Sequence, residues 1–253
     1  MQIFLSFDFD ADAAEHLYFR DKPVKKSRAR FGTRALQRIL SILKKHSILT
    51  TFFIPGWTAE KYRDLVNDIV QHGHEIAMHG YMHEKLDTLT YEEELEVHKK
   101  ALSVLGVYQN MIYGFRRPYF EISKNTLSII SDLGIIYDSS LMDSEEPYLL
   151  KVGDNYIVEL PVYDIFDDWL LFEMEHRTPH SVLNFWKYEL ESYIEADLEY
   201  FCLILHPACI GRTGRIKILE EFIIFAKNKK CIFADGYSIA KRILQKCSDK
   251  NVF

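Results

Sequence analysis

Two histidines in this sequence have a spacing that suits metal binding. His79 and His83 lie four residues apart, directly after the apolar run 76–78 and on either side of the turn that begins at Gly80. If that turn is helical, both side chains lie on one helix face, where two imidazoles can reach one ion. Such a pair alone is more often a solvated helix face than a metal site. The interpretation therefore depends on a third ligand.

Asp8 and Asp10 provide candidate oxygen ligands at the end of a predicted buried strand over residues 3–9. Side chains alternate between the two faces of a strand, so both carboxylates point the same way. They should repel each other unless a cation or a reaction requires both. On this stretch alone, the alternative remains that one caps the loop and the other is solvated. Together Asp10, His79 and His83 offer three ligands and leave one position open, as in catalytic zinc sites.

The remaining reactive residues complete a hydrolytic set. A divalent cation at an open site activates water and polarises a carbonyl oxygen. Asp8 would act as general base while Arg116 keeps it ionised, and His206 could protonate a departing nitrogen. The backbone N–H of Tyr119, directly after Pro118, could donate to the oxyanion. The set describes metal-assisted hydrolysis of an unactivated acyl bond, most naturally an amide.

Alternating strands and helices are predicted to position these residues. Such alternation is typical of βα units that form a parallel sheet or barrel. The reactive residues follow the carboxyl ends of different strands, which gather at one mouth of a parallel barrel. The predicted strands cover residues 3–9, 49–54, 76–78, 111–115, 135–137, 156–161, 201–205 and 231–233, and the predicted helices cover 33–45, 58–72, 90–105, 123–133, 181–200, 216–227 and a last segment from Gly236.

Composition places the chain among globular proteins with a full core. Its 253 residues are 48% hydrophobic and 27% charged, and they fit one domain over 1–253. A net charge of -6 without a basic tail argues against nucleic acid as a partner. No apolar run is long enough to insert into a membrane. Residues 1–7 lack the features of a signal peptide, and four cysteines without a Cys-x-x-Cys pair are typical of reduced thiols, so a cytoplasmic location is expected.

Nine stretches, in order along nearly the whole chain, resemble the polysaccharide deacetylase family, the NodB-homology enzymes of carbohydrate esterase family 4. The subgroup that the chain most resembles lacks signal peptides and includes a peptidoglycan-deacetylase-like protein, a metal-free allantoinase and cyclic imide hydrolases. The stretches are SFDFD (6–10), TFFIPGW (51–57), GHEIAMHGYMHE (73–84), GFRRPY (114–119), YDSSLM (137–142), ELPV (159–162), DDW (167–169), LILHP (203–207) and IGRTGR (210–215).

The resemblance implies an α/β fold, a distorted seven-stranded (β/α) barrel with one divalent metal ion, usually zinc. It also implies a homo-oligomer. By position, the family's metal ligands fall on Asp10, His79 and His83. The base, the acid and the partner of the base fall on Asp8, His206 and Arg116, and the expected substrate contacts are Tyr119, Trp169, Trp57 and Asp168.

Three functions remain open at this point. The leading hypothesis is a cytoplasmic deacetylase of a small N-acetylated sugar or glycan precursor. The same groups could instead open a cyclic amide or imide, although the intact ligand set argues against the metal-free branch. A binding module without activity is the third, and the retained ligands and base argue against it. Arg117 and the basic segment 20–30 could contact substrate or could simply be solvated.

Overall fold

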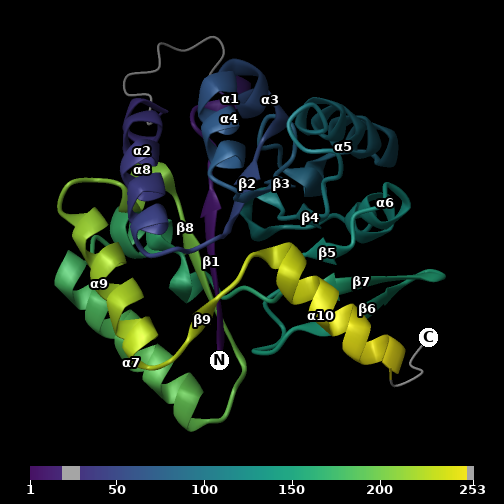
Figure 1. Cartoon of the computed structure of the whole chain (residues 1–253). Helices are drawn as coiled ribbons and strands as arrows, with labels where there is room; N and C mark the ends of the chain where they lie inside the picture. The colour runs from purple at the N-terminus through teal and green to yellow at the C-terminus, as the bar shows by residue number, and fades with distance from the viewer. Residues whose placement is uncertain (19–28, 250–253) are drawn as a thin grey trace.

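A curled, mostly parallel sheet forms the centre of the computed structural model, which describes residues 1–18 and 29–249 (Figure 1). The strand order is β6-β7-β5-β4-β3-β2-β1-β8, and β9 pairs with β1. Neighbouring strands run parallel, except for the antiparallel hairpin of β6 and β7. The strands are β1 Gln2–Asp8, β2 Thr51–Ile54, β3 Glu75–Met78, β4 Gly114–Phe115, β5 Tyr137–Asp138, β6 Tyr148–Val152, β7 Asn155–Glu159, β8 Tyr200–Leu205 and β9 Ile232–Phe233.

Strand β1 lies between β2 and the terminal strand β8, and it is buried on both faces. It pairs with β2, β8 and β9, which explains its nearly continuous apolar sequence. Leu5 and Phe7 belong to the larger core cluster, whereas Phe4 belongs to a second, smaller cluster on the inner face of the curl. Because side chains alternate, Asp8 shares the inner face with Phe4. The strand therefore delivers Asp8 to the inside of the curled sheet at its carboxyl end.

Helices surround the sheet (Figure 1). A capping box starts the helix that was predicted from residue 90, because Thr90 Oγ1 accepts a hydrogen bond from the backbone N–H of Glu93, and the Glu93 carboxylate accepts one from the backbone N–H of Thr90. The helices are α1 Ala13–Tyr18, α2 Ala29–Lys45, α3 Gly56–Lys61, α4 Arg63–Gln71, α5 Tyr91–Leu105, α6 Thr126–Asp132, α7 Pro179–Glu195, α8 Pro207–Ile210, α9 Arg215–Asn228 and α10 Gly236–Asp249.

The predicted α/β barrel-type fold is confirmed, with a sheet that is curled but open. β6 and β8 stand at the two ends of the strand order. Within residues 1–18 and 29–249, the outer edge of β8 is paired only through a single bridge between Asp167 and Ile204. The strand β6 was not predicted. It forms a hairpin with β7 and runs antiparallel to the rest of the sheet.

The helix predicted over residues 58–72 is wrong in one respect, because it consists of α3 and α4. The break lies at Tyr62, whose backbone leaves the helical region with φ −114° and ψ 45°. The Tyr62 hydroxyl donates a hydrogen bond to Asp12 Oδ1 at 2.8 Å. The break thus coincides with a tertiary contact that no local apolar pattern reveals.

A buried carboxyl group ties α10 to the amino ends of the strands. Glu75, the first residue of β3, accepts hydrogen bonds from Thr51 Oγ1 at 2.6 Å, the Tyr137 hydroxyl at 3.0 Å and the backbone N–H of Tyr237 at 3.0 Å. Burial raises the pKa of Glu75 to about 7, although these three donors oppose the rise. The start of α10 is therefore bonded to the Glu75 carboxyl group, which holds its proton more tightly than the carboxyl group of a free glutamate.

Glu75→Gln is expected to flatten part of the pH dependence of the unfolding free energy. The folded protein binds the Glu75 proton more tightly than the unfolded chain, so this stabilisation is complete below about pH 4.5 and is lost as the pH rises to about 7. The shift corresponds to at most about 3 kcal/mol. Glutamine stays neutral and can still accept from Thr51 and Tyr237. Urea unfolding of both proteins between pH 4.5 and 8 measures the difference, and parallel curves would contradict the assignment.

No described helix is long and apolar enough to cross a membrane. The longest of the described helices, α2 and α7, have 17 residues each.

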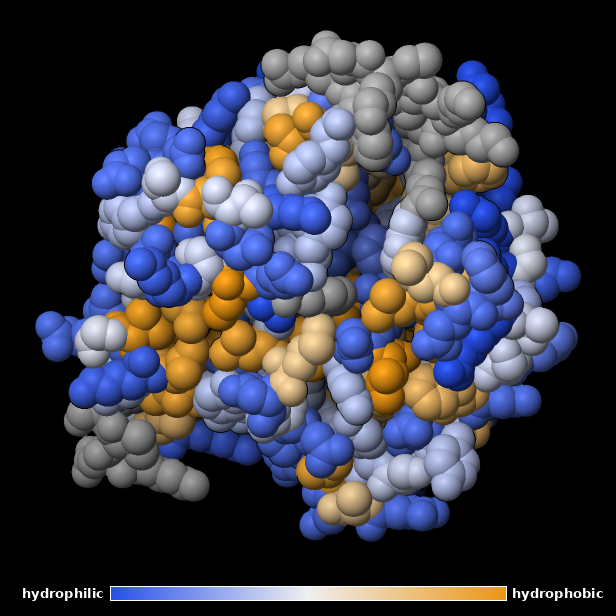
Figure 2. Space-filling view, turned by 180° about the vertical axis from the view of Figure 1, so that it is seen from behind, coloured by the Kyte–Doolittle hydropathy of each residue, from blue (hydrophilic) through white to orange (hydrophobic). Residues whose placement is uncertain are grey.

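On the face shown in Figure 2, hydrophobic residues gather in a band across the middle, between largely hydrophilic regions above and below.

Candidate metal centre and active site

The structure brings together residues that follow the carboxyl ends of four strands. Asp10 comes two residues after β1, His79 directly follows β3, Arg116 directly follows β4, and His206 directly follows β8. These strand ends meet at one mouth of the curled sheet, as in other parallel barrels. The sequence positions of these residues span most of the chain, so only the folded sheet assembles them.

Asp10, His79 and His83 form a group with the geometry of a metal site. One donor atom from each lies within 4.8 Å of the other two. His79 Nε2 is 3.5 Å from Asp10 Oδ1, and His83 Nε2 is 3.7 Å from Asp10 Oδ2. His79 Nδ1 lies 2.7 Å from the carbonyl oxygen of Arg116, which can only accept, so Nδ1 is protonated and the Nε2 lone pair faces Asp10.

The donor set fits a divalent cation. It combines one carboxylate oxygen with two imidazole nitrogens, a set that zinc favours. Asp10 Oδ1 is buried and has no hydrogen-bond partner among the described residues. A buried carboxylate oxygen without a partner is costly. A cation held by Asp10, His79 and His83 would satisfy it.

The prediction that His79 and His83 lie on a helical turn is wrong. The segment between them is a loop, and both Gly80 (φ 69°) and His83 (φ 63°) adopt left-handed conformations. The Glu84 carboxylate fixes the loop by accepting hydrogen bonds from the backbone N–H groups of Tyr81 at 2.9 Å and Met82 at 2.8 Å. The two imidazole rings still meet, with centroids 4.9 Å apart. The reversal of the backbone in this loop brings the two imidazoles together, whereas the prediction relied on the spacing of residues along a helix.

Arg116 is fully buried and bonded to Asp8. Its NH1 group donates to Asp8 Oδ1 at 2.7 Å and to Ser6 Oγ at 2.9 Å, while Nε and NH2 donate to the carbonyl oxygen and hydroxyl of Ser139 at 3.1 and 2.9 Å. Burial raises the pKa of Asp8, but the guanidinium and two nearby histidines outweigh it, so the net pKa is lowered. Asp8 is therefore ionised at neutral pH. The sequence analysis assigned no role to Ser6 or Ser139.

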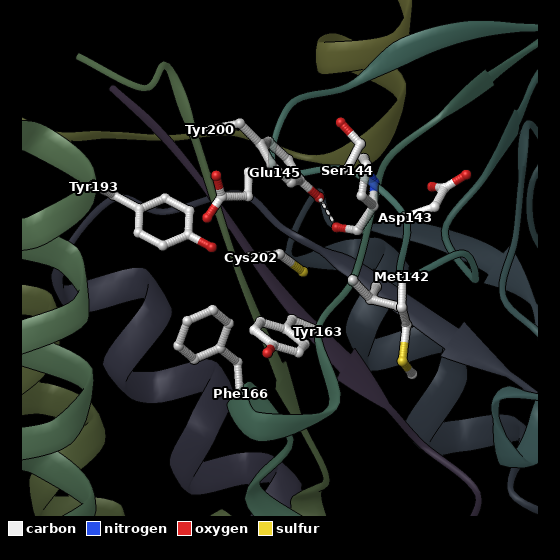
Figure 3. A pocket seen from close by; sticks show the side chains of 11 residues that line it. Met142, Asp143, Ser144, Glu145, Tyr163, Phe166, Tyr193, Tyr200 and Cys202 are labelled. Atoms are coloured by element: carbon white, nitrogen blue, oxygen red, sulfur yellow. Dashed lines mark hydrogen bonds between the residues drawn. The ribbon is translucent and has the colours of Figure 1, made fainter. Parts of the chain in front are cut away.

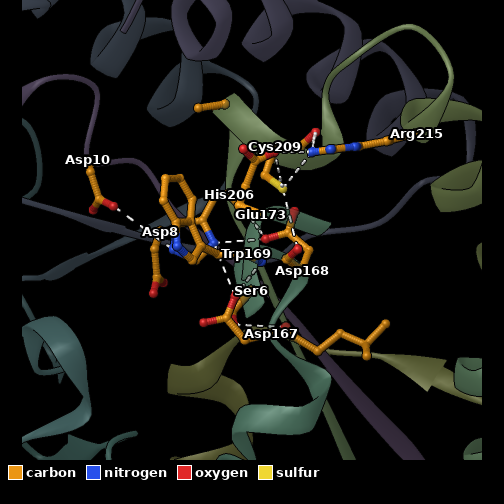
Figure 4. Close-up of polar contacts among 12 residues, drawn as sticks. Ser6, Asp8, Asp10, Asp167, Asp168, Trp169, Glu173, His206, Cys209 and Arg215 are labelled. Atoms are coloured by element: carbon orange, nitrogen blue, oxygen red, sulfur yellow. Dashed lines mark hydrogen bonds and ion pairs between the residues drawn. The ribbon is translucent and has the colours of Figure 1, made fainter. Parts of the chain in front are cut away.

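Two consecutive aspartates hold His206 (Figure 4). His206 Nδ1 is 2.8 Å from Asp168 Oδ1 and 3.5 Å from Asp167 Oδ1, and its Nε2 lies 4.0 Å from Asp10 Oδ2. Burial lowers the pKa of His206, but the two carboxylates outweigh burial and raise it well above its usual value. The ring is therefore protonated at neutral pH, with Nε2 facing the Asp10 side. Although Asp167, Asp168 and His206 also lie within 4.8 Å of one another, the short Nδ1–Oδ1 contact describes a hydrogen-bonded pair.

Asp168 was predicted as a substrate contact, and the structure places its carboxylate against His206. Asp168 has no exposed surface, and its Oδ1 accepts from both the ring and the backbone N–H of His206. It lies behind His206 and positions it. The signal that could have shown this was the pair Asp167-Asp168 itself, because two adjacent buried acids require a cationic partner.

A second layer supports the segment after β8. Arg215 donates to Glu173 Oε1 at 2.6 Å and lies 3.0 Å from Cys209 Sγ, and that thiol contacts the carbonyl oxygen of Asp168 at 3.4 Å (Figure 4). Arg212 is 3.5 Å from the same Glu173 oxygen. These contacts connect α8 and α9 to the aspartate that bonds His206.

The predicted aromatic contacts divide into two groups. Tyr119 adopts a left-handed conformation (φ 59°), is 42% exposed, and places its ring 4.5 Å from that of His83. The Trp169 ring lies 5.9 Å from His206. Both therefore border the site. Trp57 instead packs against His16, with ring centroids 4.5 Å apart, beneath the Lys61 ammonium.

Arg117 and the basic segment stay as sequence-based hypotheses. The backbone N–H of Arg117 donates to Ser140 Oγ at 3.0 Å, and burial lowers the pKa of its partly buried guanidinium. The cluster of basic side chains in the segment 20–30 falls largely on residues 19–28, outside the described part of the chain, whereas Arg30 lies exposed in α2.

The chain is similar to known proteins in both sequence and structure. A family profile described as polysaccharide deacetylase matches residues 14–137. The peptidoglycan deacetylase of Helicobacter pylori is 27% identical over 244 residues, which cover 83% of each chain. A crystal structure from Mycobacterium smegmatis, described as a polysaccharide deacetylase, matches with a TM-score of 0.88 at 31% identity, and covers 97% of this chain and 90% of that one. The crystal structure of the Puue allantoinase matches with a TM-score of 0.85 at 20% identity over 95% of this chain and 89% of that one, a likeness of fold alone.

Proposed function

The chain belongs to the polysaccharide deacetylase family, and on that premise we propose that it removes the acetyl group from an N-acetylated sugar unit of a glycan. Members of this family are hydrolases that act on carbon–nitrogen bonds other than peptide bonds. The observation that supports the proposal best is the convergence of Asp10, His79 and His83 within 4.8 Å, beside Asp8 and His206. The peptidoglycan deacetylase of H. pylori, similar over most of both chains, supports an N-acetyl sugar as the substrate class.

Asp10, His79 and His83 would hold one divalent cation, and we propose zinc because of the mixed oxygen and imidazole donors. When bound, such an ion supplies an activated water and polarises the acyl oxygen. The Arg116 carbonyl keeps His79 in the tautomer whose Nε2 can act as a ligand. The Glu84 carboxylate keeps the loop folded so that His83 faces Asp10.

Asp8 is proposed as the general base. Its Oδ2 lies 3.9 Å from His79 Nε2, so the carboxylate borders the ligand group without being one of the three closest donors. Arg116 occupies Oδ1 at 2.7 Å and leaves Oδ2 to face the site. Because its pKa is lowered, Asp8 is deprotonated at neutral pH and can accept a proton from the attacking water.

His206 is proposed as the general acid. Asp168 accepts a hydrogen bond from Nδ1, and Nε2 lies 4.0 Å from Asp10 Oδ2, facing the ligand group. The raised pKa keeps the ring protonated at neutral pH, so Nε2 can give a proton to the departing sugar nitrogen. Tyr119 and Trp169, which border His83 and His206, are proposed as the walls against which the sugar lies.

Acetate release tests the proposal. Protein reconstituted with zinc is expected to release acetate from N-acetylglucosamine or its β-1,4-linked oligomers, and chelation should abolish the release. A parallel assay measures ring opening of hydantoin-like compounds and cyclic imides. Ring opening without acetate release would replace the proposed substrate by a cyclic amide, and no turnover of either class with full zinc occupancy would refute the proposal.

A further inference from the structure

A separate cavity opens in the wall of the sheet, where the open edge of β8 faces the segment after β7 (Figure 3). Its volume is about 470 Å³, within the range of small-molecule sites, roughly 300–1,000 Å³. The residues that line it come from the loop after β5, the segment after β7, α7 and β8. They include none of the described residues assigned to the metal centre, so the cavity is a second site.

Aromatic rings form much of its lining. Phe166 stands edge-on to Tyr163, with ring centroids 5.7 Å apart at 90°, and to Tyr193, at 6.1 Å and 72°. Tyr200 closes the floor by donating its hydroxyl to the carbonyl oxygen of Pro161 at 3.1 Å. Figure 3 shows the Tyr163, Phe166 and Tyr193 rings arranged around the Cys202 thiol. Ring faces of this kind suit a compact ligand with apolar C–H surfaces.

The charge of the cavity is negative. Asp143 and Glu145 line it, whereas its lining, as far as the chain is described, contains no lysine, arginine or histidine. The Tyr148 hydroxyl donates to both carboxylate oxygens of Asp143, at 2.9 and 2.8 Å. Burial, and then the Glu145 carboxylate, raise the pKa of Tyr193, so its phenol is neutral. Such a lining repels anions and attracts cations, because aromatic faces and carboxylates both stabilise positive charge.

We infer that this cavity binds an amino sugar through its free ammonium group. The ammonium lies among the ring faces near the Glu145 carboxylate, and the sugar C–H faces contact Tyr163 and Phe166. Binding of an organic ammonium ion follows from the lining alone. Its identity as an amino sugar rests on the proposed function, since N-deacetylation produces that cation. Phe166 is followed directly by Asp167 and Asp168, so an occupant would adjoin the segment that holds His206.

Calorimetric titration of the full chain tests the inference. Metal-free protein at pH 6 is titrated with glucosamine, N-acetylglucosamine and glucose. Glucosamine should bind at least about tenfold more tightly than the other two, because only it carries a positive charge. No turnover is measured, so failure here leaves the proposed deacetylation untouched, and failure of acetate release leaves this binding untouched.

Variants locate the ligand. Glu145→Gln and Tyr163→Ala change exposed side chains and should each weaken glucosamine binding at least about fivefold, because a carboxylate or a ring face is lost. Tyr188→Ala, on the exposed face of α7 and outside the cavity, is the matched control and should bind normally. Equal affinity for the three sugars, or unchanged binding in both lining variants, overturns the inference. So does binding that is lost in His83→Ala but kept in Glu145→Gln.

Discussion

His83→Ala is expected to lower the rate of acetate release at least about a hundredfold and to lower the zinc content of the purified protein. The imidazole is one of only three donors in the proposed site, and Asp10 and His79 alone would leave the ion with two protein ligands. The fold should survive, because His83 lies in a loop that Glu84 holds through backbone groups of Tyr81 and Met82. Zinc content by atomic absorption and kcat on an N-acetyl sugar measure both effects.

His180→Ala is the matched control, because His180 is an exposed histidine at the start of α7. It should keep the zinc content and kcat of the unmodified protein. If His83→Ala retained both as well, the group of Asp10, His79 and His83 would not be the metal site. Loss of rate with full zinc content would instead assign His83 to substrate positioning.

Asp8→Asn is expected to lower kcat by about 10²–10⁴ while zinc content stays unchanged. The amide has nearly the same shape as the carboxylate, and its oxygen can still accept from Arg116, so the buried contact at 2.7 Å is preserved. What is lost is the ability to accept a proton from water. This separation of zinc content from rate distinguishes the base from the three ligands.

Asp132→Asn, an exposed aspartate at the end of α6, controls for the substitution itself and should leave kcat unchanged. The pH profile adds a second readout. The lowered pKa of Asp8 predicts that the unmodified protein keeps its base ionised well below neutral pH. An Asp8→Asn protein with normal kcat would remove Asp8 from the reaction.

The meeting of the site residues could be predicted because it depends on two simple periodicities. Alternation along the strand predicted over residues 3–9 suggested that Asp8 and the adjoining Asp10 point the same way. Alternation of strands with helices placed His79, Arg116 and His206 at the same ends of parallel strands. Neither step needs knowledge of individual contacts. The element boundaries were less accurate. The strand predicted over 111–115, for example, is only Gly114–Phe115.

Local conformation that depends on tertiary contacts was not predictable. The backbone of His83 is left-handed because Gly80 and the Glu84 carboxylate reverse the chain, whereas the i and i+4 spacing suggested a helix. Asp168 appeared to be a pocket residue because only the folded structure places His206, 38 positions away, against its carboxylate. Likewise Tyr62 breaks a continuous apolar stripe through its bond to Asp12.

The pairing of β1 has a consequence for how this protein is made. A ribosome releases β1 before any of its partners, yet Gln2 pairs with Tyr200 in β8 and with Ile232 in β9. The nascent chain therefore carries an apolar strand with a bare edge until β8 has been made, and such edges recruit other chains. Only when β8 emerges can the strand that bears Asp8 be enclosed. The mouth of the sheet therefore assembles long after β1 has been made, and the growing chain is exposed to aggregation until β8 has been translated.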